Sequence, residues 1–76
     1  MDTRTDTDQA VAEVVASALR EAGVAQRDAA ERTGIPMTTL RRRLTGHSSF
    51  TMSELARIAA LLDTTVTALL EPETAA

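Results

Sequence analysis

Apolar residues recur every three or four positions along most of this chain, which is the spacing of a helix that buries one side. The clearest stripe lies between Gln9 and Ala22 and comprises Val11, Val14, Val15, Ala18, Leu19 and Ala22. The three glycines and two prolines fall at or between the ends of such stripes. A sandwich or barrel would need many β-branched strands and many turns. The pattern therefore predicts an all-α fold.

Five short helices are expected, and most have a local start or stop signal. Their expected extents are 9–22, 26–33, 36–45, Met52 to Asp63, and Val66 to Leu70. Asp6, Thr7 or Asp8 is expected to cap the first helix, and a glycine to end each of the first three. Thr51 and Glu54 have the spacing of a capping box at the start of the fourth. That helix is expected to turn these residues inward: Met52, Leu55, Ile58, Ala59 and Leu62.

The length of 76 residues suits one small domain. We expect a compact five-helix bundle over residues 8–71, with flexible tails at 1–7 and 72–76. The chain has no cysteine, which fits a reducing cytosol. It also has no apolar run long enough to cross a membrane. We therefore expect a cytoplasmic protein.

Charge is distributed unevenly along the chain, although the net charge is only −3. Residues 32–57 contain five arginines and one acid, whereas residues 1–31 contain seven acids and three arginines. Local potential, rather than net charge, steers a polyanion toward a protein surface. The middle of the chain is therefore a candidate surface for nucleic acid.

Three consecutive arginines, 41–43, lie in the helix expected over 36–45. At about 100° per residue, Leu40 and Leu44 share one side of that helix, with Met37 close by. The opposite side and its edges carry Thr38, Thr39, Arg41, Arg42, Arg43 and Thr45. Such a surface either only faces solvent, as charged helix surfaces commonly do, or binds a ligand. The preceding short helix and the tight turn TGIP favour a ligand, because together they form a helix-turn-helix unit that places its second helix in the DNA major groove.

Two segments, GVAQRDAAERTGIPMTTLRRRLTG and FTMSELARIAALLDTTVTALL, resemble the lambda-repressor-like, Cro/C1-type (XRE) helix-turn-helix family. The resemblance covers about residues 15 to 70. The positions in register are Gln26, Ala30, Gly34, Ile35, Thr38, Thr39, Leu40, Gly46, Leu55, Ile58, Ala59, Leu62 and Leu69. The resemblance implies a lambda-repressor-like fold that binds double-stranded DNA.

Roles follow from this resemblance for the matching and neighbouring residues. The expected base contacts are Met37, Thr38, Arg41 and Arg42, and the expected backbone contacts are Gln26, Arg27, Thr39, Arg43, Thr45, His47 and Ser48. The resemblance also implies a two-fold dimer through Leu61, Val66 and Leu70. In such a dimer the two recognition helices would lie about 34 Å apart. Ala25 and Pro36 replace the family's usual polar caps, and Met37 replaces its Gln or Arg. Specificity is therefore expected to shift toward Arg41 and Arg42.

No catalytic motif is recognisable in the chain. It lacks a P-loop, a dinucleotide fingerprint and a paired-carboxylate site. His47 is the only histidine and has no companion ligands for a metal. We therefore expect no enzyme activity, metal, cofactor or small-molecule ligand.

These observations together predict a sequence-specific DNA-binding transcriptional regulator, of the phage or prophage repressor type, acting on an operator that a dimer would make palindromic. Two alternatives stay open. One is an antitoxin-like or regulatory protein-interaction module on the same helical scaffold, and the other is the DNA-binding fragment of a longer regulator. Salt dependence distinguishes the first alternative, because phosphate contacts weaken steeply with salt and an apolar protein interface does not.

Overall fold

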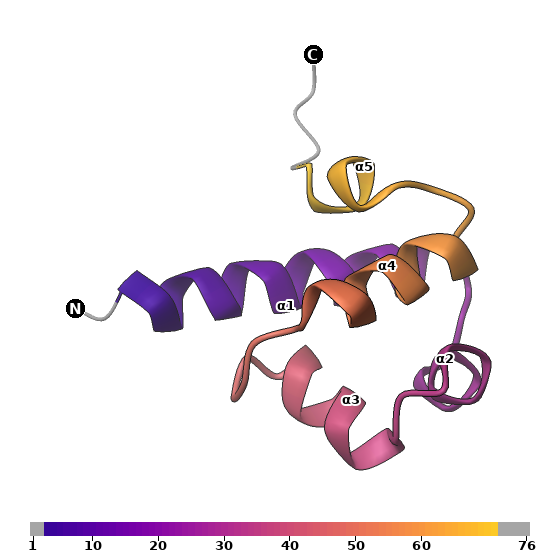
Figure 1. Cartoon of the computed structure of the whole chain (residues 1–76), viewed down its shortest axis with the longest axis horizontal. Helices are drawn as coiled ribbons and strands as arrows, with labels where there is room; N and C mark the ends of the chain where they lie inside the picture. The colour runs from indigo at the N-terminus through magenta and orange to yellow at the C-terminus, as the bar shows by residue number, and fades with distance from the viewer. Residues whose placement is uncertain (1–2, 72–76) are drawn as a thin grey trace.

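The computed structural model describes residues 3–71, and these form five helices and no strand (Figure 1). The helices are α1 (Thr3–Glu21), α2 (Gln26–Thr33), α3 (Met37–Leu44), α4 (Met52–Leu61) and α5 (Val66–Leu70). The predicted all-α five-helix bundle is confirmed. Residues 1–2 and 72–76, and with them the tail predicted at 72–76, lie outside the described residues.

The first helix, α1, is longer than its apolar stripe predicts. It begins at Thr3, so the predicted start at Gln9 and the predicted cap at residues 6–8 are wrong. The segment expected as a tail, 1–7, is helical from Thr3 onward. Residues 3–8 contain neither glycine nor proline, so no strong helix breaker stops α1 there. The stripe marks where the helix packs, not where it begins.

After α1, α2, α3 and α4, a residue with positive φ follows the last turn. After α1, Gly23 has a φ of 71°, and Val24 N–H donates to Leu19 O at 2.9 Å. Such bonds satisfy carbonyl groups that a helix end leaves open. The end of α4 uses Asp63 in the same way, with a φ of 58° and a bond of 2.8 Å from Thr64 N–H to Ala59 O. After α4, the positive-φ position is therefore occupied by an aspartate, which has a Cβ atom, and not by a glycine.

Replacing Asp63 with glycine is expected to stabilise the fold by about 0.5–1 kcal/mol, because glycine reaches positive φ without steric cost. Asp63→Val, with a branched side chain in the same backbone conformation, is expected to cost about 1 kcal/mol or more. Urea unfolding followed by circular dichroism measures both changes. A glycine variant that unfolds at lower urea than the parent would contradict this interpretation of the α4 end.

The core is built from side chains of all five helices and of the turn between α2 and α3. Val15, Leu40 and Ile58 are the largest fully buried side chains, and they come from α1, α3 and α4. Packed around them are Leu19, Ala29, Ala30, Ile35, Leu55, Ala59 and Leu69. The inward face predicted for α4 is confirmed except at Met52, which is 70% exposed. Met52 is the first residue of α4 and lies nearly one turn before the buried stripe begins.

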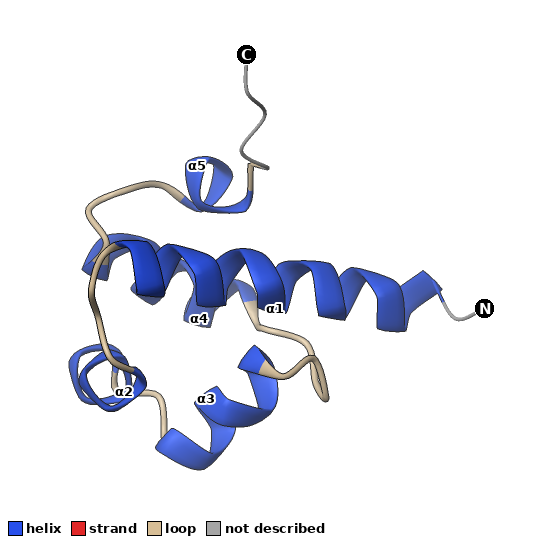
Figure 2. Ribbon diagram, turned by 180° about the vertical axis from the view of Figure 1, so that it is seen from behind, coloured by secondary structure: helices blue, strands red, loops and turns tan. Residues whose placement is uncertain are grey.

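The helices are arranged so that the molecule has two distinct sides. The pair α2 and α3 lies on one side of α1 and α4, and α5 lies on the other (Figures 1 and 2). In agreement, α2 contacts α3 and α4, whereas α5 contacts α1 and α4. We call the outer surface of the first pair the α2–α3 face.

Candidate nucleic-acid interface

The turn between α2 and α3 is held by Thr33 and Gly34. Gly34 has a φ of 78°, and its N–H donates to Ala30 O at 2.9 Å. The buried hydroxyl of Thr33 donates to Ala29 O at 2.6 Å and accepts from Ile35 N–H at 3.3 Å. Because Ile35 is itself buried, these bonds fix the direction in which the chain leaves α2. Sequence reasoning missed Thr33, whose only signal is its place directly before the turn glycine.

Apolar side chains anchor α3 from behind. Leu40 is 0% exposed, and Met37 and Leu44 are partly buried against the core. Pro36, expected as the first helical residue, precedes the helix as its N-cap, with a ψ of 141°. Thr45, expected as the last helical residue, is the C-cap. The predicted buried stripe of this helix is confirmed, and its ends move inward by one residue.

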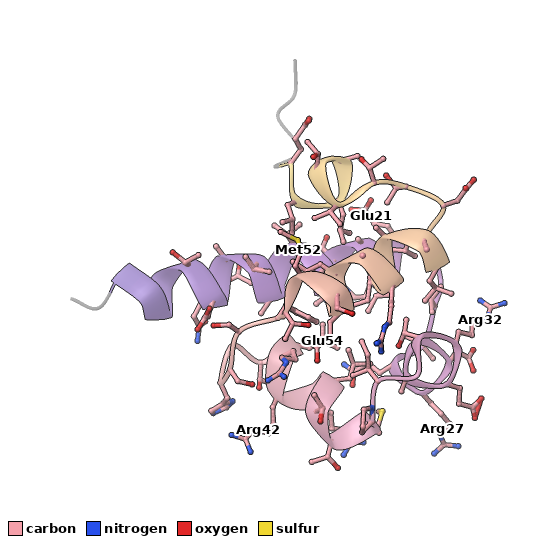
Figure 3. All side chains as sticks on the ribbon, in the orientation of Figure 1. Glu21, Arg27, Arg32, Arg42, Met52 and Glu54 are labelled. Carbon is pink, nitrogen blue, oxygen red and sulfur yellow. The ribbon has the colours of Figure 1, made fainter. Side chains whose placement is uncertain are left out.

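The opposite side of α3 is polar and open to solvent. Thr38, Arg41, Arg42 and Thr45 are exposed, and Thr39 is partly exposed. Figure 3 shows Arg42 of α3 and Arg27 of α2 extending away from the rest of the molecule on the α2–α3 face. Gln26, at the start of α2, is also exposed. Two helices thus contribute polar and cationic side chains to one face.

The beginnings of α2 and α3 lack side-chain caps. Ala25 and Pro36 occupy the cap positions, and neither provides an acceptor. The first N–H groups of a helix have no partner within the helix, so they are available to an anion, and the helix dipole favours one there. Asp28 in the first turn of α2 partly offsets this attraction. Beside Met37, between the two helices, lies a shallow hollow of about 390 Å³.

Arg43 is placed differently from its two arginine neighbours. Its Nε donates to Glu54 Oε1 at 2.9 Å and its Nη2 to Glu54 Oε2 at 3.3 Å, which makes a two-point ion pair. Its Nη1 donates to Ser48 Oγ at 2.7 Å. Only 20% of the Arg43 side chain and 14% of the Glu54 side chain are exposed. Arg43 and Ser48, both expected at the DNA backbone, thus join α3, the following loop and α4.

Glu54 also carries the capping box predicted from the sequence, which is confirmed. Thr51 Oγ1 accepts from Glu54 N–H at 3.0 Å, and Glu54 Oε1 accepts from Thr51 N–H at 2.9 Å. Burial acts to raise the pKa of Glu54, but the bonds from Arg43 and Thr51 and the Arg43 charge outweigh it. The pKa of Glu54 therefore lies below its ordinary value of 4.5.

Glu54→Gln is expected to lower stability at pH 7 by about 1–2 kcal/mol, because it removes the charge of a largely buried pair. It keeps an oxygen for Thr51 N–H. Since folding lowers the Glu54 pKa, its stabilising contribution is present above 4.5 and is lost as the pH falls below 4.5 through the lowered value. The variant should therefore lose less stability than the parent on acidification, as measured by urea unfolding across this range. Glu31→Gln, at an exposed site, is the matched control, and equal acid sensitivity of Glu54→Gln and the parent would contradict the prediction.

The segment after α3 is ordered by local hydrogen bonds. Thr45 Oγ1 lies 3.0 Å from Arg41 O and 2.7 Å from His47 Nδ1. Gly46 has a φ of 81°, and a Cβ atom there would lie 3.1 Å from the Gln9 side chain. The predicted helix stop at Gly46 is confirmed, and the bonds place exposed Thr45 and His47 side by side.

Metal-binding clusters and membrane-spanning helices are two further features that the described residues, 3–71, allow us to assess. Among the residues described there, no group of three or more acidic or histidine side chains is placed to hold a metal ion. None of the described helices has the length and apolar character that a membrane span requires.

A family model described as helix-turn-helix matches residues 15–69, which run from the middle of α1 to α5. The protein belongs to the XRE-type helix-turn-helix family. Searches among curated proteins and solved structures give no significant match. Membership identifies this helix-turn-helix protein as a DNA-binding regulator of the XRE type.

The residues predicted for contact with DNA or with a second copy fall in separate places on this helix-turn-helix protein. Gln26, Arg27 and the exposed residues of α3 belong to the two helices that form the α2–α3 face. The residues predicted for a dimer, Leu61, Val66 and Leu70, lie at the end of α4 and in α5, and each is partly buried against the core. The arrangement therefore keeps the predicted DNA contacts and dimer contacts apart.

Proposed function

We propose that this protein is a sequence-specific regulator of transcription, acting as a repressor, that places α3 in the major groove of double-stranded DNA. The observation that carries the proposal is the polarity of α3. Leu40 is completely buried on one side, while Thr38, Arg41 and Arg42 are exposed on the other. A helix anchored in this way presents a rigid polar surface of the width that a major groove admits.

Base contacts are assigned to the outer side and leading end of α3. Arg41 and Arg42 suit guanine, because arginine donates in parallel to O6 and N7. Thr38 suits a base edge near the helix start. Met37 offers only apolar contact, and the hollow beside it has room for a thymine methyl group.

Backbone contacts are assigned to residues around this helix. Gln26, Arg27, Thr39, Thr45 and His47 are assigned to phosphates on either side of the groove, and their exposure or partial exposure supports this assignment. Arg43 and Ser48 contribute by holding the loop after α3, through their mutual bond and the Glu54 ion pair. A phosphate near the α2 start gains from the open amide groups there.

A two-fold dimer through Leu61, Val66 and Leu70 would set two α3 helices about 34 Å apart, which is one turn of DNA. The same symmetry requires a palindromic operator. Sedimentation of the protein with its selected duplex tests this, and the expected stoichiometry is two chains per duplex. A complex of one chain per duplex would exclude the dimer.

Selection of preferred sites from random duplexes, followed by titration at 50 and 200 mM salt, tests the proposed function. We expect enrichment of one palindromic site. One phosphate neutralised by Arg27 in each chain of a dimer would weaken binding about tenfold between the two salt concentrations, because each neutralised phosphate releases counterions. Selection without enrichment, or affinity that does not change with salt, would contradict the proposal.

A further inference from the structure

An open groove lies on the side of the molecule that carries α5, away from the α2–α3 face. Its volume is about 530 Å³. The floor is apolar and is formed by Val14 and Ala18 of α1, by Ala22 directly after α1, and by Leu62 and Leu69. We call it the α1–α5 groove. Ala22 is exposed, and Val14 and Ala18 are only partly buried, so this strip along α1 and its end is not completely covered within residues 3–71.

The rim of the α1–α5 groove is acidic. Glu13 and Glu21 of α1, and Glu71 after α5, line it and are exposed. Among the described residues that line the groove there is no arginine or lysine. Figure 3 shows Glu21 beside α5, whereas Arg27 and Arg42 extend from the other side of the molecule. The two sides of the protein therefore differ in the charge they present.

Helical geometry aligns the acidic and apolar parts of this groove. Glu13, Ser17 and Glu21 recur at four-residue spacing along α1. Val14, Ala18 and Ala22 have the same spacing one position later, and Ala22 follows the end of α1 with a helical bond from its N–H to Ala18 O. Residues four apart are neighbours on a helix surface, so a polar edge runs beside an apolar strip. The strip spans about 14 Å, the length of two to three helical turns.

We propose that the α1–α5 groove binds an amphipathic segment of a partner protein, in which apolar side chains are flanked by arginine or lysine. The apolar side chains cover the floor of the groove, and the basic ones reach the three rim carboxylates. A helix laid in a groove is a recurring form of such recognition. Complementary charge at the rim selects the partner and speeds its association.

The acidic rim argues against two other occupants of the groove, a second copy of this protein and nucleic acid. A two-fold pair of copies joined through this groove would bring six rim carboxylates into one interface, with no arginine or lysine among the described lining residues to pair with them. Nucleic acid would meet the same repulsion. The proposal does not depend on DNA binding. The groove lies away from the α2–α3 face, and the residues proposed for the dimer, Leu61, Val66 and Leu70, do not line it.

Titration of the whole protein with designed peptides tests the proposal. The probe is an 18-residue helical peptide with a leucine stripe flanked by arginines. Its binding is measured by fluorescence anisotropy and by the amide shifts of ¹⁵N-labelled protein. We expect saturable binding, with the largest shifts at residues of α1 and α5 that line the groove. A scrambled peptide of the same composition should bind at least about tenfold more weakly, because it keeps the charge but loses the apolar face.

Two protein variants separate the groove from general attraction. Glu13→Gln/Glu21→Gln/Glu71→Gln should weaken the peptide about tenfold, the sum of three exposed charge pairs. Asp28→Asn/Glu31→Gln/Asp63→Asn changes net charge equally at exposed sites outside the groove and should have a much smaller effect. Equal losses in both variants, scrambled-peptide binding as tight as the probe's, or largest shifts on α3 would overturn the proposal. Self-association that buries the groove would also overturn it. None of these measurements contains DNA, so their failure leaves the proposed function untouched.

Discussion

Replacing Leu40 with alanine is expected to leave the protein largely unfolded at room temperature. Leu40 is 0% exposed and lies in the core where α3 contacts α1 and α2. Removing a buried leucine typically costs about 2–5 kcal/mol, because both transfer energy and packing are lost. A core in a domain of this length supplies only about 3–5 kcal/mol of net stability. The substitution therefore removes most of the stability available.

Thermal unfolding followed by circular dichroism measures this loss. Met52→Ala is the matched control, because Met52 is also a large apolar residue in a helix but is 70% exposed. It is expected to change stability by no more than about 0.5 kcal/mol. A Leu40→Ala variant that unfolds at the same temperature as the parent would show that α3 is not anchored through this side chain.

Replacing Arg42 with alanine is expected to weaken binding to the selected duplex by about 1–3 kcal/mol, or roughly 5- to 150-fold. Arg42 is exposed on α3 opposite the buried leucines and extends away from the molecule. If it donates to a guanine, its loss also relaxes selectivity at one base pair. Fold stability should change little, because the side chain is exposed.

Titrating a panel of duplexes, each with one base pair changed, measures both effects. Arg20→Ala removes the same charge from the last turn of α1 and should weaken all duplexes slightly and equally. Selectivity that stays unchanged in Arg42→Ala, with equal losses on every duplex, would reassign Arg42 to a phosphate. Affinity equal to that of the parent would contradict its place in the interface.

Much of the fold was predictable because its signals are local. The capping box of Thr51 and Glu54 needs residues only three positions apart, and the sequence predicts it correctly. Gly34 and Gly46 end their helices with positive φ as expected, since glycine alone reaches that conformation without steric cost. The spacing of Leu40 and Leu44 likewise identified the inner side of α3.

Part of what the sequence did not predict depends on contacts between distant residues, and part on local features without a sequence signal. The ion pair of Arg43 and Glu54 joins residues eleven positions apart, and helical spacing within α3 does not tell Arg43 from Arg42. Thr33 fixes a turn through its hydroxyl, which composition does not indicate. The start of α1 was missed because the residues before Val11 carry no apolar stripe. The α1–α5 groove exists only once α5 packs on α1.

The ion pair of Arg43 also bears on why three arginines occur in sequence. One of them, Arg43, is committed to Glu54 and Ser48 within the molecule, while Arg41 and Arg42 are exposed. The run therefore serves two purposes. It fastens the end of α3 to α4, and it leaves two cations on the side proposed to meet DNA.

The central claim is that the outer side of α3 meets the DNA, and nuclear magnetic resonance of the complex with the selected duplex tests it most directly. Intermolecular NOEs report which protein hydrogens lie close to base protons. We predict NOEs from the methyl groups of Thr38 and Met37 to the bases, with amide shifts concentrated at residues 38–45 and at the start of α2. NOEs to DNA from α1 and α5, with the amides of α3 unshifted, would contradict the account.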